Sequence, residues 1–213
     1  NYAAGRILAG LVDRTRGNWG MKERFAALLC LLFLFPLAAC GAQEAPSEPT
    51  PTIRPAVFSE DAQALLELLN GKEEALVFFD YTVEAPIQSV STEVWKYEDG
   101  TWNQSGHVFG NIEPGEYRMG FRFTPSGYEI FDISDTGHNT YTYQDSVDLD
   151  GCAATFSTQL GDSQEIVCGE EIPLLLKAGS ASGSIAGSLE DFRSIDCSAG
   201  LAVTVTFSDT PID

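Results

Sequence analysis

The chain holds two histidines, and His138 is the one with carboxylates close to it in sequence. Asp132 and Asp135 precede it within the polar run DISDTGH. A carboxylate beside an imidazole suits general acid–base catalysis, so these three residues predict a hydrolytic site if one cleft holds them. A polar turn between two strands is the competing interpretation, and no GxSxG elbow supplies a nucleophile. The other histidine, His107, is expected in a loop with neighbouring glycines.

A second group of carboxylates, in the run DSVDLDG, has the residue types that suit a hard cation. Asp145, Asp148 and Asp150 stand just before Gly151, and Ca²⁺ prefers such oxygen ligands. Their spacing departs from the D-x-D-x-D-G pattern of an EF-hand, and no glutamate stands at the twelfth position. The alternative is a solvated turn, in which case the protein needs no cofactor.

Three aromatic residues gather around one predicted hairpin. Trp95 and Tyr97 precede the turn Glu98-Asp99-Gly100, and Trp102 follows it. Alternation along a strand places Trp95 and Tyr97 on the same face. Exposed rings of this kind could stack on sugars, which predicts a carbohydrate-binding surface. Cross-strand aromatic packing explains the same residues without a ligand.

Short strands are the elements that would position these side chains. After Gly71, nine or ten apolar or alternating segments are separated by turn signals. This is typical of a mostly β protein, an antiparallel β-sandwich for which an immunoglobulin-like form is one candidate. Segments 152–160 and 165–168 predict a hairpin around Gly161-Asp162. The predicted core comprises Leu76, Phe78, Val94, Tyr117, Met119, Phe121, Phe123, Ile130, Phe156, Leu175, Val203 and Val205.

One short helix is predicted over residues 59–70, at the N-terminal side of the β-rich region. Ser59 is a suitable N-cap, and Glu60 and Asp61 suit the positive end of the helix dipole. Its leucines form a broad apolar stripe. We expect this stripe to pack on one side of a sheet, with binding to a partner as the alternative.

The run MKERFAALLCLLFLFPLAAC, residues 21–40, indicates where the chain works. Lys22 and Arg24 precede an apolar segment, 25–39, that spans roughly 22 Å as a helix. This is short of the roughly 30 Å hydrocarbon core of a bilayer, so a signal peptide is favoured over a spanning helix. Its last residues with the next glycine, LAACG at 37–41, resemble the lipobox of bacterial lipoproteins.

The resemblance implies that the Cys40 thiol carries a lipid and that the chain is cleaved just before it. Acyl chains such as palmitate would then anchor the protein to the cell membrane at its extracytoplasmic face, and more than one chain is needed for stable attachment. An ordinary secretory signal that happens to end before a cysteine is the alternative. Residues 1–20 are interpreted as an upstream extension, 21–39 as the signal peptide, 40–55 as a proline-rich tether and 56–213 as one β-rich domain.

The chain is strongly acidic, with 31 acidic and 12 basic residues and a net charge of −19. Removal of residues 1–39 takes away five bases and two acids, which leaves a net charge of −22. Phosphate contacts need lysine and arginine, so this balance argues against a nucleic-acid partner. It also disfavours flat binding to an anionic membrane, and it suits either simple solubility or a basic partner.

Three cysteines remain beyond Cys40: Cys152, Cys168 and Cys197. Outside the cytoplasm disulfides persist, and three cysteines allow one bridge and one free thiol. Cys152 and Cys168 flank the predicted hairpin, so they are the preferred pair.

The expected protein is a non-enzymatic cell-envelope lipoprotein whose β-sandwich binds a protein or glycan partner through loops or a sheet edge. Two alternatives remain. One is a hydrolase of envelope polymers that uses Asp132, Asp135 and His138, and the other is a Ca²⁺-stabilised carbohydrate-binding module.

Overall fold

The computed structural model describes residues 50–69 and 75–213. The predicted signal peptide, Cys40 and residues 41–49 of the predicted tether lie outside the described residues, so lipidation of Cys40 stays a prediction. The end of the predicted tether is wrong, because residues 52–55 form a strand in which Ile53 is fully buried. The described residues belong to the second of two compact units, Glu48–Asp213. Within this part of the chain, no helix has the length and apolar character to cross a membrane.

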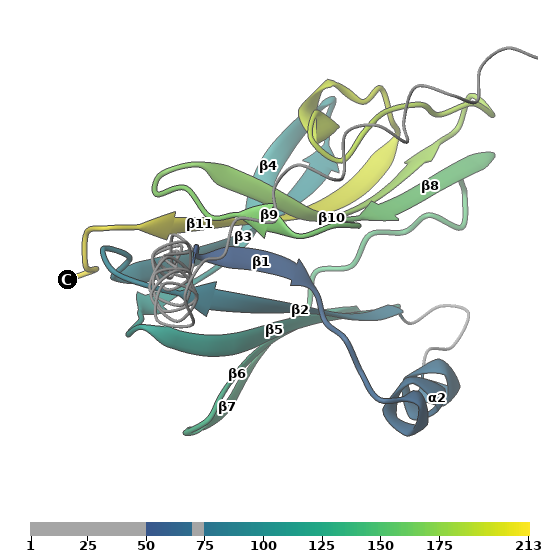
Figure 1. Ribbon diagram of the computed structural model, residues 1–213. Helices are drawn as coiled ribbons and strands as arrows, with labels where there is room; N and C mark the ends of the chain where they lie inside the picture. Colours follow the sequence, from purple (N-terminus) through teal and green to yellow (C-terminus); the bar gives the residue numbers. More distant parts are fainter. Residues whose placement is uncertain (1–49, 70–74) are drawn as a thin grey trace, which may run out of the picture. The chain divides into compact units, whose positions relative to one another are not determined.

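Two antiparallel sheets form the fold, which confirms the predicted β-sandwich class (Figure 1). The six-stranded sheet has the order β7-β6-β5-β2-β1-β9 and consists of β1 (Thr52–Pro55), β2 (Ala75–Val83), β5 (Gly115–Thr124), β6 (Gly127–Ser134), β7 (Gly137–Tyr143) and β9 (Gln164–Glu165). The five-stranded sheet has the order β4-β3-β11-β10-β8 and consists of β3 (Ser89–Glu98), β4 (Thr101–Asn111), β8 (Ala154–Gln159), β10 (Glu171–Ser180) and β11 (Ala199–Ser208). The described residues also form the helix α2 (Glu60–Leu69) and the short 3₁₀ helix η1 (Phe192–Ser194).

The main core lies between the two sheets, because every second side chain of a strand points inward. On β5, Met119, Phe121 and Phe123 are buried, as their alternation predicts. Tyr117 packs against this core while remaining half-buried. Five further residues of the predicted core are buried as well: Val94, Ile130, Leu175, Val203 and Val205.

Strand β2 contradicts two of the core predictions. Phe79 and Tyr81 are buried in the core, so alternation turns Leu76 and Phe78 to the opposite side of the sheet. The segment ALVFF is apolar at every position, so its sequence carries no alternation from which the inward face could be chosen. On the outer side Phe78 covers Gly120, where an added Cβ would lie 2.5 Å from the Phe78 ring.

Helix α2 begins as predicted but does not pack as predicted. Ser59 caps it, since the Ala62 N–H donates to Ser59 Oγ at 3.3 Å. None of residues 60–69 is buried, and Leu65, Leu68 and Leu69 are 62%, 82% and 64% exposed. The reason is topological. Strands β1 and β2 are antiparallel neighbours, so α2 is an insertion beyond their ends and need not cross a sheet face (Figure 1).

Strands β8 and β9 do not form the predicted hairpin. Strand β8 pairs with β10 in the five-stranded sheet, whereas β9 pairs with β1 in the six-stranded sheet. Gly161 and Asp162 therefore carry the chain from one sheet to the other. Gly161-Asp162 carries the same local turn signal whether the flanking strands pair with each other or join different sheets, so the sequence alone favours the hairpin.

A second, smaller core lies on the outer face of the five-stranded sheet. Strands β10 and β11 are antiparallel neighbours, but the chain between them is long; we call residues 181–198 the β10–β11 connection. This connection folds back over the sheet and buries apolar side chains against it. Phe156, a predicted core residue, packs here rather than between the sheets. The buried members are Leu176, Ala178, Leu189, Phe192, Ile195, Cys197 and Ala202.

Candidate functional site

The aromatic residues predicted to stack on sugars pack against the β10–β11 connection. The Trp102 ring makes edge contacts with Phe192 and Tyr97, at centroid distances of 5.0 and 5.5 Å. The Arg193 guanidinium lies over the Trp95 ring at 4.3 Å. Contacts within the protein thus account for this cluster. Tyr97 and Trp102 also line a surface cavity of about 370 Å³, and sugar binding stays a prediction.

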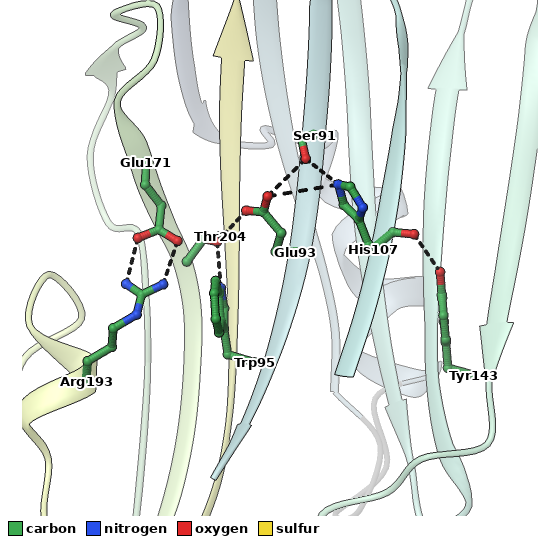
Figure 2. A network of polar contacts seen from close by, with 8 residues as sticks. All are labelled: Ser91, Glu93, Trp95, His107, Tyr143, Glu171, Arg193 and Thr204. Carbon is green, nitrogen blue, oxygen red and sulfur yellow. Dashed lines mark hydrogen bonds and ion pairs between the residues drawn. The ribbon is translucent and has the colours of Figure 1, made fainter. Parts of the chain in front are cut away.

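Beside this packed region, a connected set of polar side chains crosses the five-stranded sheet (Figure 2). Arg193 donates to both carboxylate oxygens of Glu171, at 2.6 and 2.8 Å. The hydrogen bonds from Arg193 lower the pKa of Glu171, although burial acts in the opposite direction. The Trp95 indole N–H donates to Thr204 Oγ1 at 3.0 Å, and Thr204 donates to Glu93 at 3.2 Å. Arg193 therefore ties the β10–β11 connection to β10 through Glu171 and to β3 through the Trp95 ring, and Thr204 joins β11 to β3.

Ser91, Glu93 and His107 continue this network and have the residue types of a catalytic triad (Figure 2). Ser91 Oγ lies 2.6 Å from His107 Nε2 and donates to Glu93 Oε1 at 3.0 Å. Glu93 Oε1 lies 4.0 Å from the same ring nitrogen. In a hydrolytic triad the acid and the nucleophile engage opposite ring nitrogens, so this geometry does not activate Ser91. The sequence prediction of a loop at His107 is wrong, because β4 places His107 opposite Glu93.

The residues of the hydrolase alternative lie on the β6–β7 hairpin, but not in one cleft. Asp132 pairs with Asn139, and His138 pairs with Ile133 on the next rung, so Asp132 and His138 point to opposite faces. Asp135 lies in the exposed turn between the strands. Burial raises the pKa of Asp132, and its hydrogen bond with Asn139 works against that rise. The hairpin therefore separates the proposed acid from the imidazole.

The carboxylates predicted to bind Ca²⁺ have different hydrogen-bond partners. Asp145 Oδ1 accepts from Lys96 Nζ at 2.5 Å, and hydrogen bonds to Asp145 and Glu98 raise the pKa of Lys96. Asp148 Oδ1 accepts from the Asp150 backbone N–H at 2.9 Å. No group of three or more His, Cys, Asp or Glu side chains gathers around a point in residues 50–69 and 75–213. Calcium binding at this loop stays a prediction.

The preferred disulfide pair is not compatible with the observed strand order. The Ala153 N–H donates to the Ser180 carbonyl, so Cys152 lies at the C-terminal end of β10. Cys168 lies near the opposite end, three residues before Glu171. With about 3.3 Å per residue of strand, at least about 20 Å separates the two, whereas a disulfide needs Cα atoms within about 7 Å. The prediction depended on the hairpin, and both are wrong; all three thiols are free in this structure.

Helix α2 contributes an exposed apolar surface. Leu65, Leu68 and Leu69 lie within a 100° arc of the helix and are all more than half exposed; we call them the leucine face of α2. Val57, just before the helix, is 75% exposed. Contiguous exposed apolar side chains are a feature of protein–protein interaction sites.

Comparison with known proteins adds no functional information. No protein-family model, no curated protein and no solved structure matches this chain.

Proposed function

We propose that this protein is a non-enzymatic lipoprotein of the cell envelope whose β-sandwich domain binds a protein partner through the leucine face of α2. Acyl chains on Cys40 would hold it at the extracytoplasmic face of the membrane. The observation that supports the binding role is the exposure of Leu65, Leu68 and Leu69, at 62%, 82% and 64%.

The leucine face suits the mode in which an amphipathic helix lies in a groove. Such helices are recognised through apolar side chains at i, i+3, i+4 and i+7. In α2, Leu65, Leu68 and Leu69 stand at the i, i+3 and i+4 positions of this spacing. An isolated helix of ten residues is marginal in water, and α2 has no buried residue to stabilise it. A partner that covers the leucines would supply the burial that the domain does not.

Charge indicates the chemistry of the partner. The helix carries Glu60, Asp61 and Glu67 and no basic residue. A groove with an apolar floor and basic rim would complement it, whereas an anionic membrane would repel the acidic side. Glycans are recognised largely by aromatic stacking, and α2 has no aromatic residue. A basic protein therefore fits this surface better than a glycan or a lipid.

Retention from an envelope extract tests the binding role. We compare the full chain with the double variant Leu65→Glu/Leu69→Glu and with Gln63→Glu, which adds a carboxylate on the opposite side of the helix. A basic protein should be retained by the full chain and by Gln63→Glu, and lost from the double variant. Equal retention by all three would show that the leucine face is not the binding surface.

Anchoring needs a separate test, because the domain could bind its partner without a lipid. The full chain should incorporate a fatty-acid probe, and Cys40→Ala should not. A chain with Cys40 intact that is released to the medium unlabelled would contradict the lipoprotein assignment and leave the binding proposal standing.

A further inference from the structure

A cleft of about 490 Å³ lies between the two sheets at the end where the chain passes from β7 to β8. Phe123 of the six-stranded sheet and Lys177 and Leu201 of the five-stranded sheet form part of its wall. The acidic linker 145–150 and the β5–β6 turn complete it. This volume lies within the range of sites for small ligands. Polar groups supply more of its lining than apolar groups do.

Lys177 is a basic side chain directed into the sandwich. On β10, Leu175 faces the main core and Leu176 and Ala178 face the second core, so alternation points Lys177 inward. Its Nζ lies 4.7 Å from the centroid of the Phe123 ring. Burial lowers the pKa of Lys177, as expected for an ammonium partly removed from water.

The unusual feature of Lys177 is that it has no ion pair among residues 50–69 and 75–213, although this domain is rich in carboxylates. Four other basic residues of the described chain do have one: Lys96, Arg118, Arg122 and Arg193. Arg54 also lacks one, but it is exposed to water, which solvates its charge. In the cleft, the contact with Phe123 replaces only part of the lost hydration of the ammonium. Lys177 thus presents an uncompensated positive charge to whatever enters.

The opposite charge lies on the acidic linker. Asp145 is neutralised by Lys96, at 2.5 Å. Asp148 and Asp150 are exposed and have no basic partner within the described residues. The cleft therefore offers one half-buried cation, an apolar wall and two carboxylates in the linker that lines it. A simple anion would be attracted by Lys177 but repelled by Asp148 and Asp150. A simple cation would be attracted by the two carboxylates but repelled by Lys177.

The geometry points to a binding site for a small zwitterion, such as an amino acid or a short peptide, in this cleft. The ligand carboxylate would contact Lys177 Nζ, its ammonium would contact Asp148 or Asp150, and its apolar part would lie against Phe123 and Leu201. This site is independent of the leucine face of α2, so either proposal can fail without the other.

Calorimetric titration of the purified full chain tests the site with three matched probes: 6-aminohexanoate, hexanoate and hexylamine. The shorter 4-aminobutanoate and the longer 8-aminooctanoate vary the distance between the ammonium and the carboxylate of the probe. At least one amino acid of the series should bind, and hexanoate and hexylamine should bind at least tenfold more weakly. Absence of binding by all three amino acids would overturn the proposal. Hexanoate that binds as well as the best amino acid would overturn it as well, since the site would then be a plain anion site.

Variants locate the binding in the cleft. Lys177→Met keeps the length of the side chain without its charge, and it should weaken the best amino acid at least tenfold. Asp148→Asn/Asp150→Asn should weaken the same ligand but leave hexanoate binding unchanged or stronger. Arg54→Gln removes a cation that has no ion pair within the described residues and does not line the cleft, so it is the matched control and should bind as the unchanged chain does. A folded Lys177→Met, checked by its far-UV circular dichroism, that keeps full affinity would contradict the assignment.

Discussion

The guanidinium of Arg193 lies 4.3 Å from the centre of the Trp95 ring while its two terminal nitrogens bind the Glu171 carboxylate. Arg193 belongs to η1, whereas Trp95 and Glu171 belong to β3 and β10. One side chain therefore fastens the β10–β11 connection to two strands of the sheet beneath it. The second core depends on that connection being held in place.

Arg193→Ala should lower the free energy of unfolding by about 1–2 kcal/mol. The Arg193 and Glu171 side chains are 43% and 31% exposed, so solvent screens the ion pair and its share is about 1 kcal/mol or less. The cation–π contact contributes the remainder. Urea unfolding measures the change, with Arg54→Gln as the control. An unchanged midpoint would mean that apolar contacts alone hold the connection.

The ionisation of Glu171 should make the free energy of unfolding depend on pH in the acidic range. Arg193 lowers the pKa of Glu171 in the folded protein, so the ionised carboxylate stabilises the fold above its unfolded pKa of about 4.3. This contribution is lost as pH falls through the folded pKa. The difference in stability between the unchanged chain and Glu171→Gln should therefore shrink as pH is lowered from 6 to 3. Urea midpoints at each pH measure it, and a constant difference would contradict the ion pair.

The charge of Lys177 should lower the stability of the fold near neutral pH, whereas the charge of Glu171 raises it. Burial lowers the pKa of Lys177, so keeping the amine charged costs free energy at all pH values below its folded pKa. Lys177→Met should accordingly raise the midpoint of thermal unfolding at pH 7. The advantage should shrink as pH rises toward the unfolded pKa of about 10.4, because the amine is then neutral in both states. A destabilised Lys177→Met at pH 7 would show that the contact with Phe123 outweighs desolvation.

Neighbouring phenylalanines on β2 should respond differently to truncation. Phe79 is fully buried between the sheets, so Phe79→Ala should cost about 3–5 kcal/mol. Phe78 faces the outer side and is only half-buried, so Phe78→Ala should cost clearly less. Denaturant unfolding of both variants measures the two costs. The reverse ranking would mean that β2 has the opposite inward face.

The fold class could be predicted from the sequence because polar and apolar residues alternate in strands that have one solvent-exposed face. In β5, Arg118, Gly120 and Arg122 alternate with Met119, Phe121 and Phe123. The two arginines mark the outer side, so the inward side is evident from sequence. In β2 every residue of the run ALVFF is apolar, and the same reasoning chose the wrong side. The sequence of a strand shows which of its residues face inward only where polar residues mark the outer face.

Long-range pairings were beyond the reach of local patterns. Helix α2 has the stripe of a packed helix, and only the adjacency of β1 and β2 shows that it projects from their ends. Glu93 and Thr204, 111 residues apart, meet through the pairing of β3 with β11. Lys177 gave no signal in sequence, since a lysine in a strand normally reads as solvent-facing. Each of these features follows from strand order and register, which the sequence does not specify directly.

Site-specific photo-crosslinking in intact cells tests the central claim, that the leucine face of α2 binds a protein partner. A photoreactive residue is placed at Leu68, on the leucine face, or at Gln63, on the opposite side of the same exposed helix. We expect one discrete protein adduct from position 68 that is absent from position 63 and is lost when Leu65 and Leu69 are both changed to glutamate. Adducts of equal yield from the two positions, or crosslinking from position 68 to lipid alone, would contradict the account.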